Sequence, residues 1–334
     1  MTEIRVSVLM LAYNHEQFVA QAVESVLAQQ FDEPWEIVIG EDCSTDGTLG
    51  ILESYRNLHP DCIRVLAHER NLGPTENARL TLGACRGDYV AFLECDDFWT
   101  SPLKLKCQTA CLEQYPECSS CAHGTIVVDT NGQLLSRKGI PERDKLSFSD
   151  VVFQQPFHTS SFFVRREVLD HQMRRIGWSH WPLDRALFLA VSLAGTVHMH
   201  QEYMSAYRIH AKGLWTSQDR AESLMHTMRL DERLARRLPT VPARLLRRSA
   251  GKVRLALLIC NELRIPTTST LALWLRVAWQ SESWTIHLRP FLATTIKRFA
   301  PWLYPLARRC RNTIMIRRSK NAAPQFEHGA QQKS

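Results

Sequence analysis

The sequence predicts an α/β protein built on a mostly parallel sheet with helices on both faces. Three observations predict this class. Short apolar stretches of strand length recur over the first hundred residues, single amphipathic stretches of helix length separate them, and polar residues follow several of the strands. Strands buried on both faces form near-continuous apolar runs, and a helix between successive strands is typical of a parallel sheet.

The elements can be justified in order along the chain. The run VSVLMLAY (6–13) predicts the first strand, and NHEQFVAQAVESVLAQQ (14–30) predicts a helix with Asn14 as its N-cap. One face of that helix is apolar, with Phe18, Val19, Ala22, Val23, Val26 and Leu27. The same alternation then predicts a strand at 35–40, a capped helix at 44–59, a strand at 63–68, a helix at about 75–85 and a strand at 88–94.

Three polar clusters follow strands of this predicted sheet. They are AYNHE (12–16), GEDCSTDGT (40–48) and ECDDFW (94–99). Ligands of open parallel sheets bind outside the carboxyl ends of the strands, so the three clusters should meet at one edge. Taken singly, Asn14 and Ser44 could be helix caps and Asp46-Gly47 a turn, but three polar ends on one edge favour a binding site.

The third cluster places Glu94, Asp96 and Asp97 together after a buried strand. Like charges this close raise one another's pKa unless a cation, a proton or a strong donor is present. The sequence lacks GxGxxG after the first strand, GxxxxGK[ST] and GxSxG, which excludes a dinucleotide fingerprint, a P-loop and a nucleophile elbow. With these sites excluded, the carboxylates are best suited to bind a hard divalent cation, which in turn can bind a diphosphate.

Composition limits the class of protein and the number of domains. The chain has 334 residues, of which 45% are apolar and 22% charged, as in a globular protein with one large or two ordinary domains. We expect a cytoplasmic protein that is not integral to a membrane, because no leader pattern is seen at the start. The apolar stretches of the C-terminal half are interrupted at Arg254, Glu262 and Arg276, short of the ~20 residues of a spanning helix.

Ten cysteines in this length fit a reducing compartment better than a disulfide framework. Four of them gather at Cys107, Cys111, Cys118 and Cys121. A zinc knuckle is one interpretation, but only the last two form a CxxC, and the first two fall in a predicted helix. Buried thiols without a metal are the interpretation that the spacing favours.

Charge is distributed unevenly along the chain. The net charge is +7, yet residues 241–334 carry 17 Lys and Arg against 3 Glu, a net +14, which leaves −7 for residues 1–240. Such a basic segment indicates an anionic partner, either a membrane surface or nucleic acid. Nucleic acid is not expected, because the aromatic residues there lie among aliphatic ones.

Four ordered motifs together resemble the nucleotide-sugar transferases of glycosyltransferase family 2, which have the GT-A fold. They are VSVLMLAYNHEQFVAQAVESVLAQQ, EIVIGEDCSTDGT, NLGPTENARLTLGACRGDYVAFLECDDFW and YRIHAKGLWT, spread over about residues 4–216. The resemblance implies a nucleoside diphosphate sugar donor, UDP-linked, and a bound Mn²⁺ or Mg²⁺. Glu94 stands where family members commonly have an Asp.

The resemblance also implies roles for individual residues. It places the nucleotide sugar along Ala12, Tyr13, Asn14, Glu16, Asp42, Asn71, Glu94 and Asp96, with Asp42 accepting an N–H of the base. Asp96 and Asp97 form a DXD-like end for the metal, and His210 corresponds to a late His that reaches the metal or the diphosphate. The alternative for His210 is a surface or helix-end histidine.

An inverting transfer also needs a base. Asp184, in HWPLDRALFLAVSLAG (180–195), matches the family's catalytic Asp, although Leu183 replaces the usual Glu before it. Its alternative role is a helix N-terminal Asp favoured by the helix dipole. By the same resemblance, residues 158–161 line the acceptor pocket.

The resemblance divides the chain into a GT-A domain at 1–216, with a nucleotide-sugar half at 1–100 and an acceptor half at 101–216. A helical basic region at 217–318 and a disordered tail at 319–334 follow. In the basic region, Leu292, Ile296, Phe299, Leu303 and Leu306 recur at helical spacing beside basic residues. Packing on the body and an interfacial helix on anionic lipid are both open.

We therefore expect an inverting, metal-dependent glycosyltransferase of hexosyltransferase type. It would work at the inner membrane face in cell envelope polysaccharide synthesis, on a lipid-linked or surface-glycan acceptor. Two other functions remain open. One is a non-catalytic membrane-surface adaptor that keeps the sheet, and the other is a sugar-nucleotide pyrophosphorylase, whose Gly-rich basic loop after the first strand is absent from AYNHEQF.

Overall fold

The computed structural model describes residues 3–138, 140–154, 157–177, 183–211, 213 and 220–259. The chain divides into two compact units, Met1–Val253 and Arg254–Ser334. The predicted interfacial helix around Leu292–Leu306 and the predicted disordered tail lie outside the described residues.

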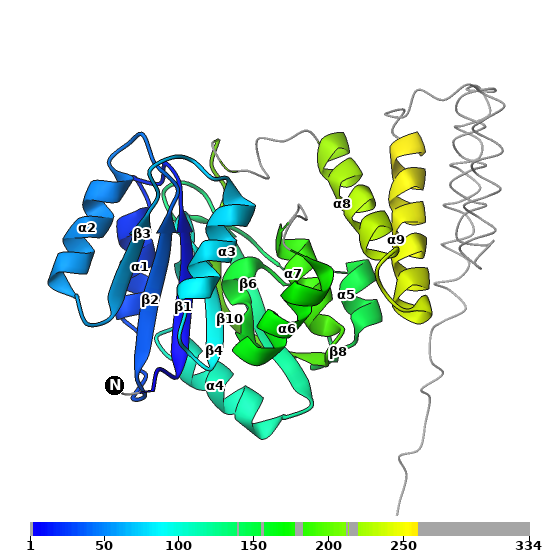
Figure 1. Cartoon of the computed structure of the whole chain (residues 1–334), viewed down its shortest axis with the longest axis horizontal. Coiled ribbons are helices and arrows are strands. Elements are labelled where there is room, and N and C mark those ends of the chain that lie inside the picture. Colours follow the sequence, from blue (N-terminus) through cyan, green and yellow to red (C-terminus); the bar gives the residue numbers. More distant parts are fainter. Residues whose placement is uncertain are drawn as a thin grey trace, which may run out of the picture. The chain divides into compact units, whose positions relative to one another are not determined.

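The first unit is a mixed α/β structure around one twisted sheet, as the alternation predicts (Figure 1). Its strands run in the order β3-β2-β1-β4-β9-β6-β10-β5, with β7 on β6 and β8 on β10. The strands are β1 (Val6–Ala12), β2 (Trp35–Glu41), β3 (Ile63–Ala67), β4 (Tyr89–Glu94), β5 (Phe98–Trp99), β6 (Cys118–Val128), β7 (Leu134–Arg137), β8 (Lys145–Leu146), β9 (Phe163–Arg165) and β10 (Thr196–Arg208).

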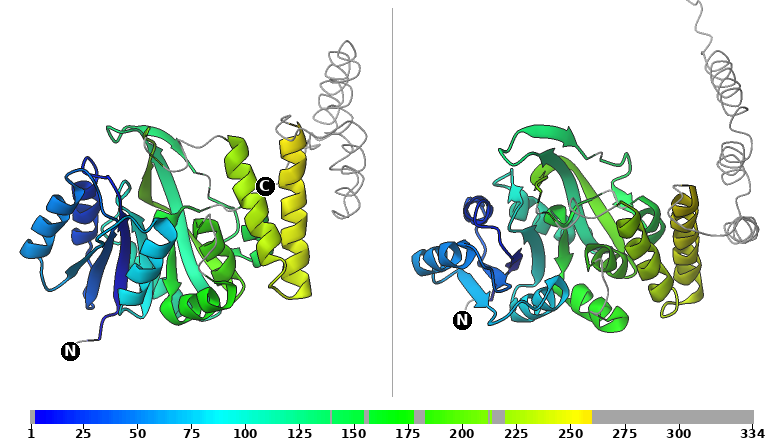
Figure 2. Two further views of the ribbon diagram at one scale, coloured as in Figure 1. Left: turned by 45° about the horizontal axis from the view of Figure 1, so that its top comes forward. Right: turned by 90° about the horizontal axis from the view of Figure 1, so that it is seen from above.

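Helices cover both faces of the sheet (Figures 1 and 2). They are α1 (Val19–Leu27), α2 (Thr48–Leu58), α3 (Pro74–Ala84), α4 (Lys104–Gln114), α5 (Phe148–Gln154), α6 (Arg166–Ile176), α7 (Leu183–Ser192), α8 (Arg220–Leu234) and α9 (Thr240–Ile259). One hydrophobic core joins the sheet to α1, α2 and α4, and another joins it to α3 and α5–α9. Successive residues of β1, such as Val8 and Leu9, enter opposite cores, so both faces of this strand carry apolar side chains.

Register brings the carboxyl ends of three strands together. β1 pairs in parallel with β2 on one side and β4 on the other, with Ala12 opposite Glu41 and Leu11 opposite Glu94. The polar segments that follow these strands therefore start at one edge of the sheet, as predicted. At Gly40 in β2, a side chain would meet the Asn77 and Thr81 side-chain oxygens at 2.1 Å, so glycine lets α3 approach the sheet closely.

Two predicted helix starts are wrong. The first helix begins at Val19 rather than 14, and the second at Thr48 rather than 44. Asn14 has a left-handed φ of 57° and accepts a hydrogen bond from the Thr45 N–H at 2.8 Å instead of capping a helix. The Ser44 hydroxyl accepts from the Asn14 N–H at 3.0 Å. Both side chains form hydrogen bonds between two loops, whereas the local sequence pattern had predicted that they cap helices.

Helices α8 and α9 are joined to α7 by a buried ion pair. Arg185 is 6% exposed and Asp231 is fully buried, and the guanidinium donates to both carboxylate oxygens at 2.9 and 2.8 Å. Arg185 also donates to Ser249 Oγ of α9 at 3.3 Å. Since Leu230, Leu234 and Leu246 lie in the adjoining core, α8 and the part of α9 within the first unit pack on the rest of that unit. None of the described helices has the length and apolarity to cross a membrane.

Removing one partner of this pair should destabilise the first unit strongly. Asp231→Ala leaves a buried guanidinium without its counter-charge, which costs about 3–5 kcal/mol, or roughly 6–20 °C in the unfolding midpoint. The matched control is Asp170→Ala, which breaks the partly exposed Arg166–Asp170 contact of 3.5 Å and should cost no more than about 1 kcal/mol. Thermal unfolding of both variants measures the difference, and equal midpoints would contradict a stabilising role for the pair.

Candidate active site

A cavity of about 380 Å³ lies at the carboxyl ends of β1, β2 and β4. The residues that line it come from all three polar clusters and from later segments. Those that the sequence singled out are Ala12, Tyr13, Asp42, Asn71, Glu94, Asp96, Asp97, His158 and Asp184. The remainder of the lining is mostly apolar and includes Leu82, Phe92, Leu169, Met173 and Leu187. Residues far apart in the chain thus line one cavity, which is the usual form of a small-molecule site.

Asp96 lies between two histidines at this cavity. His210 donates from Nε2 to Asp96 Oδ2 at 3.0 Å, and His15 Nε2 lies 3.8 Å from the same oxygen. Burial would raise the pKa of Asp96, but the hydrogen bond from His210 and the nearby imidazole of His15 bring the pKa below its ordinary value. Burial in turn lowers the pKa of His15. Asp96 is therefore the ionised member of the carboxylate group.

Asp97 is 1% exposed, and its pKa is shifted in the opposite direction from that of Asp96. Burial, followed by the charge of Asp96, raises its pKa well above the ordinary value. Its Oδ1 accepts the Arg208 N–H at 2.9 Å, while Oδ2 is buried without a hydrogen-bond partner. His158 Nδ1 lies 3.5 Å from Oδ2. A buried carboxylate oxygen without a partner is costly, and a cation would satisfy it.

Arg208 is the residue that the sequence analysis missed. It is 3% exposed and holds the acidic turn in place by donating from Nε to the Asp96 carbonyl at 3.0 Å. Its guanidinium also donates to Gln21 Oε1 at 2.6 Å and lies 4.6 Å from the Phe18 ring centroid. It occurs in the YRIHAKG motif directly before Ile209 and His210, so its position next to the metal-site candidate was the available signal.

Glu94 and Asp184 face the cavity from β4 and the first turn of α7. Burial, then the charges of Asp96 and Asp184, raises the pKa of Glu94 to about 8. Burial also raises the pKa of Asp184, although the Arg185 N–H donates to its Oδ1 at 2.7 Å. Carboxyl groups with pKa values raised toward neutrality can exchange protons near physiological pH.

Glu94 should make stability depend on pH. The folded state keeps this proton up to about pH 8, whereas the unfolded chain releases it near the ordinary value of 4.5. The native state therefore holds more protons between these values, and stability falls as pH rises through this window. At about 1.4 kcal/mol per pKa unit, the loss is on the order of several kcal/mol.

Glu94→Gln removes this titration without changing the size of the side chain. We expect the unfolding midpoint of the unaltered protein, relative to that of Glu94→Gln, to decline from about pH 5 to pH 8. Comparing the two chains at each pH cancels the titration of the other groups, such as His15 and Asp184. A difference that does not change with pH would contradict the raised pKa of Glu94.

Asp42 and Asn71 form the opposite end of the cavity. Asp42 is 3% exposed and accepts from the Leu72 N–H at 2.7 Å and the Gly73 N–H at 2.9 Å. Asn71 donates to the Asp42 carbonyl at 3.1 Å. Gly73 has a φ of +82°, which glycine adopts at little cost. The carboxylate of Asp42 thus orders the 71–73 loop, and each of its oxygens keeps a lone pair for a ligand.

Two of the predicted nucleotide-sugar residues do not line the cavity. Asn14 contacts the 44–45 loop as described above, and Glu16 Oε2 accepts the Gly47 N–H at 2.8 Å. The Asp46 side chain accepts the Glu16 N–H at 3.2 Å. Both side chains support the loops that bear the site instead of facing its interior. Ala12 and Tyr13 do line it, and the Tyr13 residue is 44% exposed.

His158 and Tyr207, from the segment predicted to form the acceptor half, line the cavity together with the carboxylates. Burial, then the charge of Lys138, lowers the pKa of His158 to about 3, so the imidazole is neutral. Its ring centroid lies 4.3 Å from that of Tyr207. Burial and the charge of Asp97 raise the pKa of Tyr207 to about 12. Of the predicted 158–161 segment, His158 and Thr159 reach the cavity, while Ser160 and Ser161 are buried.

Comparison with known proteins finds relatives of this chain. An uncharacterized protein of Mycobacterium tuberculosis is 32% identical over 212 residues, which are 63% of this chain and 60% of that protein. The chain thus spans less than two thirds of its relative.

Two solved structures share the fold. Staphylococcus aureus TarS (1–349) superposes with a TM-score of 0.59 at 16% identity, covering 84% of this chain and 80% of that TarS fragment. A further structure of TarS is a complex with UDP-GlcNAc. The mannosyltransferase PcManGT of Pyrobaculum calidifontis, in complex with GDP-Man and Mn²⁺, superposes with a TM-score of 0.54 at 16% identity, covering 89% and 87%.

The family match covers the half of the chain that carries most of the cavity. Residues 7–172 match the family model described as Glycosyl transferase family 2. This stretch contains all three polar clusters and the first nine strands of the sheet, while Asp184, Arg208 and His210 follow it. Through residues 7–172, this chain belongs to glycosyltransferase family 2.

Proposed function

We propose that this protein is an inverting, metal-dependent glycosyltransferase that moves a sugar from a UDP-linked donor to a hydroxyl of a glycan or lipid-linked acceptor. The observation that carries the proposal is the single cavity, which joins three groups of distinct use. They are the Asp42 end, the Asp96–Asp97 pair and Asp184. A nucleotide, a diphosphate and a reacting hydroxyl would meet these groups in that order.

The donor would lie along the edge of the parallel sheet. Asp42 has free lone pairs for an N–H of the base, and Ala12 and Tyr13 line the same end. The M. tuberculosis relative has no assigned substrate, so the choice of UDP rests on the family resemblance. The UDP-GlcNAc complex of TarS supports that choice.

Asp96, Asp97 and His210 are suited to hold Mn²⁺ or Mg²⁺. The fit rests on the unpartnered buried oxygen of Asp97 and on the proton that joins His210 to Asp96, which a cation could replace. When bound, the ion would neutralise charge on the departing diphosphate. The Mn²⁺ in the PcManGT complex supports this assignment. Arg208 acts as a positioning residue, since it fixes the backbone and side chain of the acidic turn.

Asp184 would serve as the base. Its ionised carboxylate accepts the proton of the acceptor hydroxyl as that oxygen forms a bond to the anomeric carbon. The bond between the anomeric carbon and the diphosphate oxygen breaks with the electron pair going to the diphosphate. A single displacement of this kind inverts the configuration at the anomeric carbon. A pKa raised by burial makes Asp184 a stronger proton acceptor than an exposed aspartate.

A thermal-shift screen is the first test of the proposal. Nucleoside diphosphates and their sugars are added with and without Mn²⁺, because a ligand that binds only the native state raises the unfolding midpoint. We expect UDP and one UDP-sugar to stabilise the chain only when Mn²⁺ is present. Slow metal-dependent hydrolysis of that sugar nucleotide without acceptor would then separate an enzyme from a non-catalytic adaptor. Absence of any nucleotide-dependent shift would overturn the proposal.

The acceptor is proposed from charge and from one relative. TarS is named as a poly(ribitol-phosphate) β-N-acetylglucosaminyltransferase. Residues 260–334 carry 12 Lys and Arg against 3 Glu, a net +9. Each basic residue near an anionic surface contributes about 1 kcal/mol to binding. We therefore propose that these residues bring the protein to the inner face of a membrane, where cell envelope precursors are assembled.

Vesicle sedimentation tests this part separately. The full chain should sediment with vesicles that contain anionic lipid, and added salt should weaken the binding because it screens the charges. A chain ending at Ile259 keeps the core residues of α9 and should remain in the supernatant. Binding that is insensitive to salt, or equal binding by the shortened chain, would contradict a role of the basic segment at a membrane.

A further inference from the structure

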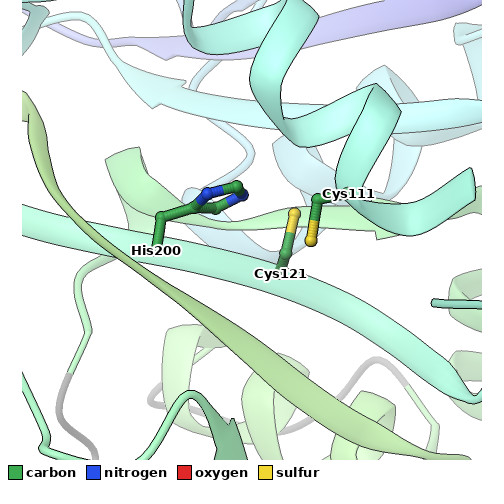
Figure 3. Close-up of side chains that lie close together, drawn as sticks. All are labelled: Cys111, Cys121 and His200. Atoms are coloured by element: carbon green, nitrogen blue, oxygen red, sulfur yellow. The ribbon is translucent and has the colours of Figure 1, made fainter. Parts of the chain in front are cut away.

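A second group of potential metal ligands lies where α4 packs on β6 and β10. Cys111 comes from α4, Cys121 from β6 and His200 from β10, and one ligand atom of each lies within 4.8 Å of the others. Figure 3 shows the two thiols and the imidazole turned toward one another between the helix and the strands. None of the three lines the cavity of the candidate active site. The group is therefore a site in its own right.

The polar atoms of this group have few hydrogen-bond partners outside the group. Cys111 is 5% exposed and Cys121 is fully buried. The Cys121 thiol lies 3.7 Å from the Gln108 carbonyl and also interacts with the Cys111 thiol within the group, and the His200 Nε2 is buried without a hydrogen-bond partner. A buried polar atom left in this state costs about 1–3 kcal/mol. A cation bound to the imidazole nitrogen and the two sulfurs would remove this cost.

A further imidazole stands next to the group. His198 pairs with Cys121 across the β6–β10 ladder, and its ring centroid lies 5.3 Å from that of His200. Its Nδ1 is also buried without a hydrogen-bond partner, while the ring stacks on Tyr115 at 4.8 Å. Two neighbouring histidines with unpartnered buried nitrogens beside two buried thiols are unusual in a core that holds no ion.

We propose that Cys111, Cys121 and His200 bind a divalent transition-metal ion, with Zn²⁺ as the expected occupant. Sulfur and imidazole nitrogen are the donors that Zn²⁺ takes, whereas Mg²⁺ and Mn²⁺ prefer the oxygen donors of the candidate active site. Binding displaces the two thiol protons to solvent, so the ion and two thiolates are neutral together. The fourth position would be taken by water or by His198.

The dimensions allow this with small adjustments. At metal–sulfur and metal–nitrogen distances of about 2.3 and 2.0 Å, ligand atoms of one tetrahedral ion lie roughly 3.5–4 Å apart. The atoms here lie within 4.8 Å, so side-chain rotation can close the site. The CxxC pattern in the sequence pairs Cys121 with Cys118, but the Cys118 Sγ lies 3.3 Å from Thr196 Oγ1. His200 follows Cys111 by 89 positions, which no short motif could reveal.

The ion would hold α4 against the sheet beneath the acidic turn. On the same helix, Gln108 donates to the Ser161 carbonyl at 2.9 Å, and the buried Lys104 lies 4.1 Å from the Trp99 ring. Trp99 in turn donates to the Ser160 carbonyl at 3.1 Å. These contacts lead from α4 to the 158–161 segment that borders the cavity. The expected role of the ion is therefore structural, and its removal should lower stability without removing the carboxylate metal site.

Cobalt spectroscopy of the full chain gives a direct test. The protein is purified under reducing conditions, stripped with a chelator and titrated with Co²⁺. We expect one equivalent to produce a thiolate-to-cobalt charge-transfer band and the intense visible bands of tetrahedral Co²⁺, and Zn²⁺ to bleach both. Zn²⁺ alone should also raise the unfolding midpoint, since it binds only the folded site.

Matched variants locate the site. Cys111→Ser and Cys121→Ser should each lose the charge-transfer band or shift it strongly. Cys107→Ser changes a thiol one turn earlier on the same helix and should keep the spectrum, as should Asp97→Asn in the candidate active site. The spectrum of the unaltered chain is decisive even if a variant does not fold. Octahedral Co²⁺ without thiolate bands, an unchanged spectrum in Cys111→Ser, or a Cys111–Cys121 disulfide whose reduced form binds no metal would overturn the proposal.

Discussion

Asp97→Asn is expected to abolish metal-dependent binding of a nucleoside diphosphate. The change replaces one carboxyl oxygen by an amide nitrogen, so the side chain can no longer give up a proton and bind a cation. The remaining oxygen can still accept the Arg208 N–H, so the acidic turn should keep its shape. Mutating a residue that hydrogen-bonds to a metal ligand typically lowers metal affinity by about 10- to 100-fold, so losing the ligand itself should lower it by at least about 100-fold. Calorimetry of UDP binding with and without Mn²⁺ measures it.

The asparagine variant is preferable to alanine for a structural reason. Asp97→Ala would leave the buried Arg208 N–H without an acceptor, at a cost of about 1–3 kcal/mol, and would confuse folding with binding. Asp88→Asn is the matched control, because that carboxylate pairs with Arg5 at 2.9 Å and does not line the cavity. Undiminished binding of UDP with Mn²⁺ by Asp97→Asn would remove Asp97 from the metal site.

Asp184→Asn should leave donor binding intact and reduce transfer by about 10²–10⁴-fold. General-base catalysis is worth about this factor, and the amide cannot accept the proton of the acceptor hydroxyl. The Asn side chain keeps an oxygen for the Arg185 N–H, so the start of α7 should be preserved. Steady-state kinetics with the donor found in the thermal-shift screen should show kcat falling while the donor KM stays unchanged.

A helix-end role for Asp184 predicts a different result, and α5 supplies the comparison. Asp150 lies in the first turn of α5 as Asp184 does in α7, and it accepts from the Ser147 N–H at 2.9 Å outside the cavity. Asp150→Asn should change stability slightly and kcat not at all. If Asp184→Asn behaves like Asp150→Asn, with an unchanged rate and an unchanged pH profile, Asp184 only stabilises its helix and the base lies elsewhere.

Much of the cavity at the ends of β1, β2 and β4 followed from the sequence because its signals are local. Apolar runs of strand length alternate with amphipathic helices, and a parallel sheet places the residue after each strand at the same edge. Glu94, Asp96 and Asp97 are contiguous with β4, so their meeting with Ala12 and Asp42 needed only the parallel register of β1, β2 and β4. The family motifs then predicted that distant segments meet at the site, which the periodicity of single elements could not predict.

Only the tertiary structure decided the contacts between segments far apart in the chain. Arg208 fixes the acidic turn from 111 residues away, and Arg185 ties α7 to Asp231 in α8. Asn14 and Glu16 contact the 44–48 loop, because a loop that bends there needs acceptors for its N–H groups. His200 joins Cys111 and Cys121 through the pairing of β10 with β6. Sequence patterns report the period and polarity of single elements, whereas side-chain partners are chosen by packing and by the cost of leaving buried polar atoms unpaired.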